Sequence, residues 1–185
     1  MTGRPSRPRR LIKSDDVTQF DSGAAELDRW LAAFAWENLR SNNAITYVST
    51  ASERVAGYYA IAAGGVDLVG VPAASRKGSR PDPMPVIVLA RLAVDRSLAG
   101  QGVGAGLLLD ALQRAAALSG SLGAAALLVH ARDTEARDFY LHNGDFLVSP
   151  VADLQQFVPM KRLTALFQSG TRRSAEGRPF TCEFA

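Results

Sequence analysis

Cysteine and histidine are almost absent from this chain of 185 residues, which has one cysteine, Cys182, and two histidines, His130 and His142. A single cysteine excludes a disulfide framework, and so few thiol and imidazole groups exclude a zinc cluster of cysteine and histidine ligands. We therefore expect no metal centre in this protein.

Long apolar runs are missing as well, because no stretch approaches the roughly 18 apolar residues of a membrane helix. The pair Arg9 and Arg10 could suggest an export signal, but residues 13–16 are polar or charged where such a signal needs an apolar region. The expected compartment is a reducing cytoplasm, without membrane contact.

The composition that remains suits one ordinary hydrophobic core, since 47% of the residues are hydrophobic and 21% are charged. The net charge is only +3, yet arginines crowd both ends of the chain. We predict a basic mobile arm over residues 1–13, a single domain over residues 14–167 and a tail over residues 168–185.

The hydrophobic pattern predicts a mixed α/β fold. An amphipathic helix is expected over residues 24–40, an antiparallel hairpin of strands at 44–49 and 55–63, and a loop over residues 64–84. A central strand at 85–94 then leads through a glycine-rich turn into a helix, and a strand at 124–130 leads into another helix that ends near residue 143. Closing strands are expected at 146–148 and 163–167.

Gly102, Gly104 and Gly106 lie between the central strand and the following helix. Such a turn leaves backbone N–H groups free at a helix N-terminus, where the helix dipole also attracts anions. A nucleoside-triphosphate loop would need a lysine after its last glycine, and a dinucleotide fold would carry the motif after its first strand. The pyrophosphate of coenzyme A remains as a ligand, beside the alternative that the glycines serve only packing.

Two blocks of the sequence resemble the GNAT N-acetyltransferases. The run Ala99-Gly100-Gln101-Gly102-Val103-Gly104 is similar to the acetyl-CoA motif of that family. The run Ala136-Arg137-Asp138-Phe139-Tyr140, with Gly144-Asp145-Phe146, is similar to the family's final helix and its signature. The resemblance implies the α/β GNAT fold: a central mixed, mostly antiparallel sheet flanked by helices, with acetyl-CoA bound at a splayed pair of strands.

A narrower resemblance, to the toxin-type GNAT enzymes, rests on five blocks in the right order. They are Phe20-Asp21-Ser22-Gly23, Leu27-Asp28-Arg29-Trp30-Leu31, Gly57-Tyr58-Tyr59-Ala60, Pro81-Asp82-Pro83-Met84-Pro85 and Leu89-Ala90-Arg91-Leu92-Ala93-Val94-Asp95. That subfamily is paired with ribbon-helix-helix antitoxins and acetylates the amino group of aminoacyl-tRNA, which stops translation. The resemblance therefore implies acetyl-CoA as co-substrate, aminoacyl-tRNA and such an antitoxin as partners, and a homodimer.

The resemblance also assigns roles to residues. Tyr140 occupies the position of the family's general acid. The coenzyme-binding residues it implies lie at the strand end and in the turn: Leu92, Ala93, Val94, Ala99, Gly100, Gln101, Gly102, Val103, Gly104 and Ala105. Three positions depart from the pattern, since Ala99 stands where the family has glutamine or arginine, Ile45 where the subfamily has a basic residue, and Asp145 is an extra residue before Phe146.

Elementary chemistry favours direct attack by an amine on the thioester, because Cys182 has no histidine near it in sequence to support a covalent route. With pKa values of about 10 for tyrosine and about 8.5 for a thiol, proton donation by Tyr140 is uphill by roughly 2 kcal/mol unless the site tunes one of them. Tyr140 could otherwise be a core residue with a solvated hydroxyl. Glu135 and Asp138 are possible bases, or residues of a solvated helix face.

Four basic residues, Arg76, Lys77, Arg80 and Arg91, are candidates for contacts with tRNA phosphates. The small net charge does not by itself establish nucleic-acid binding. Two other hypotheses stay open at this point: an acetyltransferase for a small amine or a protein amino group, and a module that binds acyl-CoA without turnover.

Overall fold

The structure is a computed structural model that describes residues 3–76 and 78–173, the last five of them by their backbone only. The chain forms two compact units. The first unit contains the described residues up to Ala62 together with Leu89–Ala111, and the second contains Ala63–Val88 and the described residues from Leu112 onward. The boundaries predicted for a single domain stay a prediction.

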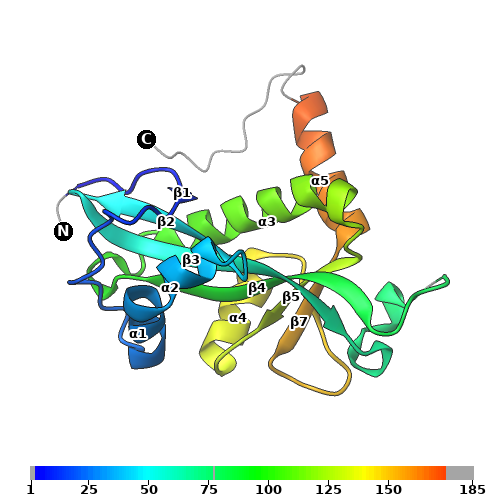
Figure 1. Ribbon diagram of the computed structural model, residues 1–185. Coiled ribbons are helices and arrows are strands. Elements are labelled where there is room, and N and C mark those ends of the chain that lie inside the picture. Colours follow the sequence, from blue (N-terminus) through cyan, green and yellow to red (C-terminus); the bar gives the residue numbers. More distant parts are fainter. Residues whose placement is uncertain (1–2, 77, 174–185) are drawn as a thin grey trace. The chain divides into compact units, whose positions relative to one another are not determined.

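Seven strands are hydrogen-bonded in the order β1-β2-β3-β4-β5-β7-β6 (Figure 1). They are β1 (Arg9–Arg10), β2 (Ile45–Ala51), β3 (Arg54–Val66), β4 (Met84–Val94), β5 (Ala126–His130), β6 (Leu147–Val148) and β7 (Gln155–Pro159). The helices are α1 (Ala25–Ala33), α2 (Ala35–Arg40), α3 (Val103–Leu122), α4 (Thr134–Asn143) and α5 (Met160–Arg173). The sheet and its helices together confirm the predicted mixed α/β fold class. None of the helices in the described ranges is long and apolar enough to cross a membrane.

In the first unit, part of the predicted basic arm pairs with the sheet. Arg9 and Arg10 lie antiparallel to β2, and the amide of Leu11 donates to the carbonyl of Thr46 at 3.0 Å. The arm is held there because Leu11 is 5% exposed and belongs to the hydrophobic core. Residues 9–11 are therefore an edge strand and its continuation, which corrects the expectation of a mobile segment over all of 1–13.

The predicted hairpin is confirmed: β2 and β3 pair antiparallel from Ile45↔Ile61 onward. The helix predicted over residues 24–40 is instead two helices, α1 and α2, because the backbone of Phe34 leaves the helical region. The two helices cover a core in which the ring of Tyr58 stacks on that of Trp30, with their centroids 5.8 Å apart.

In the second unit, β7 pairs antiparallel with both β5 and β6. The strand predicted at 163–167 is wrong, because these residues belong to α5. The pattern of exposure is helical rather than twofold, since Met160 and Leu163 are buried, Thr164 and Phe167 are half-buried, and residues 161, 162, 165 and 166 are exposed. The closing strand is β7, which the sequence pattern missed because its Gln155 and Gln156 are polar residues.

The connection between β3 and β4 is a loop with two short 3-10 helices, Leu68–Gly70 and Ala73–Ser75. The hydroxyl of Ser149 donates to the carbonyl of Gly70 at 2.8 Å, and the amide of Leu68 donates to Asp82 at 3.1 Å. The predicted loop over 64–84 is thus shorter than expected, because β3 extends to Val66. We call residues 67–83 the basic loop, since it contains Arg76, Lys77 and Arg80.

Candidate active site

The glycine-rich turn lies in the first unit, between the 3-10 helix Arg96–Leu98 and α3. Gly100 and Gly102 have φ angles of 74° and 80°, in the left-handed region that favours glycine. A Cβ atom built on either glycine would meet no other atom within 4 Å. The turn therefore has a backbone shape that favours glycine, with open space beside it.

Backbone amides are available at the end of this turn. The amide of Gly106 donates to the carbonyl of Gly102 at 3.0 Å, which starts the hydrogen-bond pattern of α3. The preceding amides, those of Val103, Gly104 and Ala105, lie in the first turn of the helix, where no helix carbonyl accepts from them. Together with the helix dipole, they suit an anion such as the pyrophosphate of coenzyme A. The residues present thus fit the coenzyme that the sequence motif implies.

The side chains predicted around the coenzyme differ in exposure. Ala93 and Val103 are buried, whereas Leu92 and Val94 at the end of β4 are half-buried. The exposed residues are Ala99, Gly100, Gln101 and Gly102, while Gly104 and Ala105 are half-buried. The structure thus brings these residues together as one strand end and turn, as their sequence spacing predicts.

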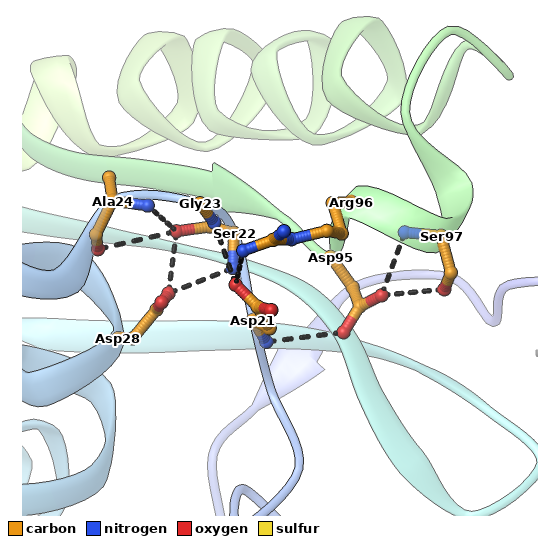
Figure 2. Close-up of polar contacts among 8 residues, drawn as sticks. All are labelled: Asp21, Ser22, Gly23, Ala24, Asp28, Asp95, Arg96 and Ser97. Atoms are coloured by element: carbon orange, nitrogen blue, oxygen red, sulfur yellow. Dashed lines mark hydrogen bonds and ion pairs between the residues drawn. The ribbon is translucent and has the colours of Figure 1, made fainter.

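Asp95, directly after β4, is a residue whose role the sequence analysis missed. It is 7% exposed, and its carboxylate accepts hydrogen bonds from the amide and hydroxyl of Ser97 at 3.0 and 2.5 Å and from the amide of Asp21 at 3.3 Å (Figure 2). Burial opposes ionisation, but these hydrogen bonds outweigh it and hold the pKa of Asp95 below its usual value. The run Asp-Arg-Ser after a strand is the signal of a capped turn that could have revealed it.

Tyr140 lies in the second unit, on α4, which begins at the side-chain cap of Asp133 on the amide of Ala136 (2.8 Å). Its ring contacts the rings of Phe139 and Phe146, and the residue is 6% exposed. Burial raises the pKa of the Tyr140 phenol above its ordinary value, so it holds its proton at neutral pH. Among the residues that the structure describes, none makes a hydrogen bond with its hydroxyl, which leaves that group available to a ligand.

Residues considered as bases lie on the surface. Glu135, Asp138, His130 and His142 are all exposed, and Asp138 forms an ion pair with Arg137 at 3.0 Å. Their exposure fits the interpretation that these four residues belong to solvated parts of helices and strands. In the described part of the chain, no three histidine, cysteine, aspartate or glutamate side chains gather as metal ligands, and Cys182 lies outside that part.

The predicted tRNA-contacting residues are found in both units. Arg76 is exposed and Arg80 is half-buried in the basic loop of the second unit, while Lys77 lies outside the described residues. Arg91, on β4 in the first unit, is exposed and its guanidinium lies 5.7 Å from the centroid of the Trp30 ring. Arg76 and Arg91 therefore reach solvent, whereas the Nε of Arg80 is buried without a hydrogen bond among the described residues.

The strand, the glycine turn and the amide-rich start of α3 define an α/β protein whose backbone amides suit an anion such as a pyrophosphate. The sequence pattern of the acetyltransferase (GNAT) family matches residues 12–144, and the chain belongs to that family. The predicted family and fold are confirmed.

Comparison with three similar proteins is more specific than the family match. A tRNA-acetylating toxin of Mycobacterium tuberculosis is 44% identical over 161 residues, which cover 87% of this chain and 96% of that relative. The structure of AtaT complexed with acetyl-methionyl-tRNAfMet is similar with a TM-score of 0.78 and 28% identity, covering 86% of this chain and 98% of AtaT. A tyrosine-to-phenylalanine variant of the AtaT toxin, bound to the C-terminus of the antitoxin AtaR and to acetyl-CoA, is similar with a TM-score of 0.73 and 26% identity, covering 89% and 98%.

Proposed function

We propose that this chain is a toxin of the GNAT family that transfers the acetyl group of acetyl-CoA to the amino group of aminoacyl-tRNA and so inhibits translation. The observation that carries the proposal is the 44% identity to a tRNA-acetylating toxin along almost the whole of that relative. The similarity to AtaT in complex with acetyl-methionyl-tRNAfMet supports the same acceptor. Its place of action is then the cytoplasm, where charged tRNA is used.

In this proposal, the turn of residues 99–105 holds the coenzyme by its pyrophosphate. Acetyl-CoA supplies a thioester, an acyl group that an amine can accept directly. The amides of Val103, Gly104 and Ala105 donate to the phosphate oxygens, and the exposed glycines let the ligand approach the backbone closely. Because these contacts come from the main chain, the departure at Ala99 removes a side-chain contact but leaves the amides in place.

Tyr140 is the residue proposed for proton transfer. Its raised pKa keeps the phenol protonated, as a proton donor to a departing thiolate must be. The phenol acts either as the general acid or, with its proton retained, as a hydrogen-bond donor to the sulfur. The acceptor needs no strong base, since an α-amine with a pKa of about 7.7–8.0 is partly neutral at cellular pH.

The exposed Arg76 and Arg91, with Lys77 and Arg80, are proposed to contact tRNA phosphates. A ribbon-helix-helix antitoxin is the proposed partner, and a flexible acidic or amphipathic segment of it would compete for this basic surface or for the coenzyme. The complex of AtaT with the C-terminus of AtaR supports a partner that binds through such a segment, and because acetyl-CoA is bound in the same complex, it favours the basic surface over the coenzyme as the object of competition. A homodimer is proposed from the resemblance alone.

The proposed acceptor can be tested with the purified protein and labelled acetyl-CoA. Aminoacyl-tRNA is compared with uncharged tRNA, with free amino acids and with a panel of polyamines and peptides, at two salt concentrations. We expect label only on aminoacyl-tRNA, with transfer that falls as salt rises, because phosphate contacts are weakened by salt. Label on small amines alone, without salt-sensitive transfer to charged tRNA, would overturn the proposed substrate.

A further inference from the structure

The entrance to the glycine turn is held by hydrogen bonds to distant parts of the sequence. Asp95 caps the 3-10 helix Arg96–Leu98 through Ser97, and its second carboxylate oxygen accepts from the amide of Asp21, 74 residues earlier. The amide of Asp95 donates to the carbonyl of Ala56 on β3 at 2.9 Å. The residue is therefore tied at once to the turn, to the sheet and to the segment before α1.

A second connection runs beside the first (Figure 2). The amide of Arg96 donates to the carbonyl of Asp21 at 2.8 Å, and its guanidinium donates to the Asp21 carboxylate at 2.6 Å. The amide and hydroxyl of Ser22 donate in turn to Asp28 on α1, at 2.9 and 2.5 Å. The Arg96–Asp21 ion pair is largely exposed and contributes little by itself, so the buried Asp95 is the centre of this network.

The turn has few internal constraints downstream of this network. Its helix ends at the buried Leu98, the amide of Gln101 donates to Leu98 at 3.3 Å, and two glycines with positive φ follow before α3 begins. Glycine backbones lose more freedom on ordering than other residues. The backbone amides that follow these glycines can converge on a phosphate without a large entropic cost only if the chain that enters the turn is already fixed.

We propose that Asp95 is a positioning residue that holds the turn of residues 99–105 in the shape that binds coenzyme A. This inference rests on the proposed function, because it requires the turn to bind that coenzyme. Asp95 acts through Ser97 and Asp21, and we assign to it no contact with the reacting groups. Its loss should weaken coenzyme binding and leave the turnover of the saturated enzyme largely intact.

The test measures coenzyme A binding by calorimetry and, separately, the KM for acetyl-CoA and kcat with aminoacyl-tRNA. Asp95→Ala removes every acceptor, and we expect the Kd and the KM to rise about tenfold or more, with kcat at saturating acetyl-CoA within about threefold of wild type. Asp95→Asn keeps an oxygen for Ser97 but turns its amide nitrogen towards the Asp21 amide, so it should give an intermediate rise. Ser97→Ala, an exposed and milder change, should raise both constants about twofold to fivefold.

Val48→Ala is the matched control, since Val48 is fully buried in the core of the same unit and makes no hydrogen bond to the turn through its side chain. It should lower the melting temperature without changing the Kd for coenzyme A. If Asp95→Ala and Ser97→Ala bind coenzyme A as wild type does, or weaken only as far as Val48→Ala does, Asp95 merely stabilises the fold and the inference is wrong. If wild type itself does not bind coenzyme A, the proposed function fails before the role of Asp95 is reached.

Discussion

The glycine turn of the first unit and the helix α4 of the second prepare for a ligand in opposite ways. The turn offers backbone amides and bare glycines, and its side chains are small or exposed, apart from the buried Val103. Helix α4 offers one side chain, the buried Tyr140, whose hydroxyl has no hydrogen-bond partner among the described residues. Binding by main-chain groups tolerates changes in side-chain chemistry, provided that the space stays open, whereas a role carried by one hydroxyl tolerates none.

The same difference extends to how each region is held in place. The turn needs a network of polar side chains around Asp95, because glycines do not hold their own conformation. Tyr140 is held by the apolar rings of Phe139 and Phe146, which fix its ring without engaging its hydroxyl. Substitutions can therefore separate coenzyme binding from transfer.

The largest expected effect is that of Tyr140→Phe, which removes only the hydroxyl. We expect transfer to aminoacyl-tRNA to fall by roughly 10²–10⁴-fold while coenzyme A binding stays unchanged, because the ring packing is kept. Steady-state transfer of labelled acetyl groups and calorimetry measure the two quantities, and expression in bacteria should change from growth arrest to tolerance. A Tyr140→Phe protein as active and as toxic as wild type would contradict the role of the hydroxyl.

Gly104→Glu tests the other side of the comparison by placing a carboxylate and its volume where the phosphates are expected. Detectable coenzyme A binding should disappear, a loss of at least about a hundredfold. Gly120→Glu is the control, because Gly120 is an exposed glycine of the same helix with no atom within 4 Å of an added Cβ. The Gly120→Glu protein carries the same added charge and should bind coenzyme A as wild type does. Wild-type affinity in a folded Gly104→Glu protein would refute the assignment of the turn.

Reversing charge in the basic loop should affect the acceptor only. We expect Arg76→Glu combined with Lys77→Glu to lower tRNA affinity roughly tenfold and to reduce its dependence on salt, because fewer counterions are released on binding. Acetyl-CoA binding should not change. The control, Arg40→Glu with Lys161→Glu, reverses two exposed charges elsewhere. An equal loss in both double variants would mean that net charge, rather than the basic loop, determines tRNA binding.

The smallest expected effect is on the pH dependence of the free energy of unfolding. The region of Asp95 should lose stability as the pH falls, and that of Tyr140 as the pH rises. The lowered pKa of Asp95 means that its contribution is present above about pH 4 and is lost as the pH falls. The raised pKa of Tyr140 means that its contribution is complete below about pH 10 and is lost as the pH rises. Urea unfolding should show a shallower acid loss in Asp95→Asn and a shallower alkaline loss in Tyr140→Phe, with Tyr58 still contributing at alkaline pH because burial raises its pKa too. Unchanged slopes in both variants would contradict these assignments.

Much of the fold could be predicted because its central elements have local signals. The apolar run of β4, the glycines and the periodicity of α3 lie next to one another in sequence, so pattern alone located them. Where tertiary contacts decide, the pattern failed. Gln156 on β7 is fully buried in a strand despite its polarity, and residues 163–167 belong to helix α5, where Leu163 is buried and Leu166 is exposed. Arg9 and Arg10 gave no sign of pairing, because the pairing depends on β2.

The candidate site divides in the same way. Tyr140 and the turn residues carry motifs and could be named from sequence, although their roles stay predictions. The partner of Asp95 could not be named, since nothing in the spacing of Asp21 and Asp95 reveals that they meet. Local capping of the Ser97 amide by Asp95 was visible in principle, whereas the long-range hydrogen bond needed the fold.

The short strand β1 has a consequence for how copies of this protein meet in solution. Without it, the apolar and mostly buried β2 would be the outer strand of the sheet, open to strand addition by another molecule. With it, the outermost strand is only two residues long and exposed, and its Arg9 is paired with Asp15. A second copy that approached this edge would find too short a strand to pair with, so intermolecular strand pairing and the aggregation that follows from it are opposed here by the length of β1 and by the charge of Arg10.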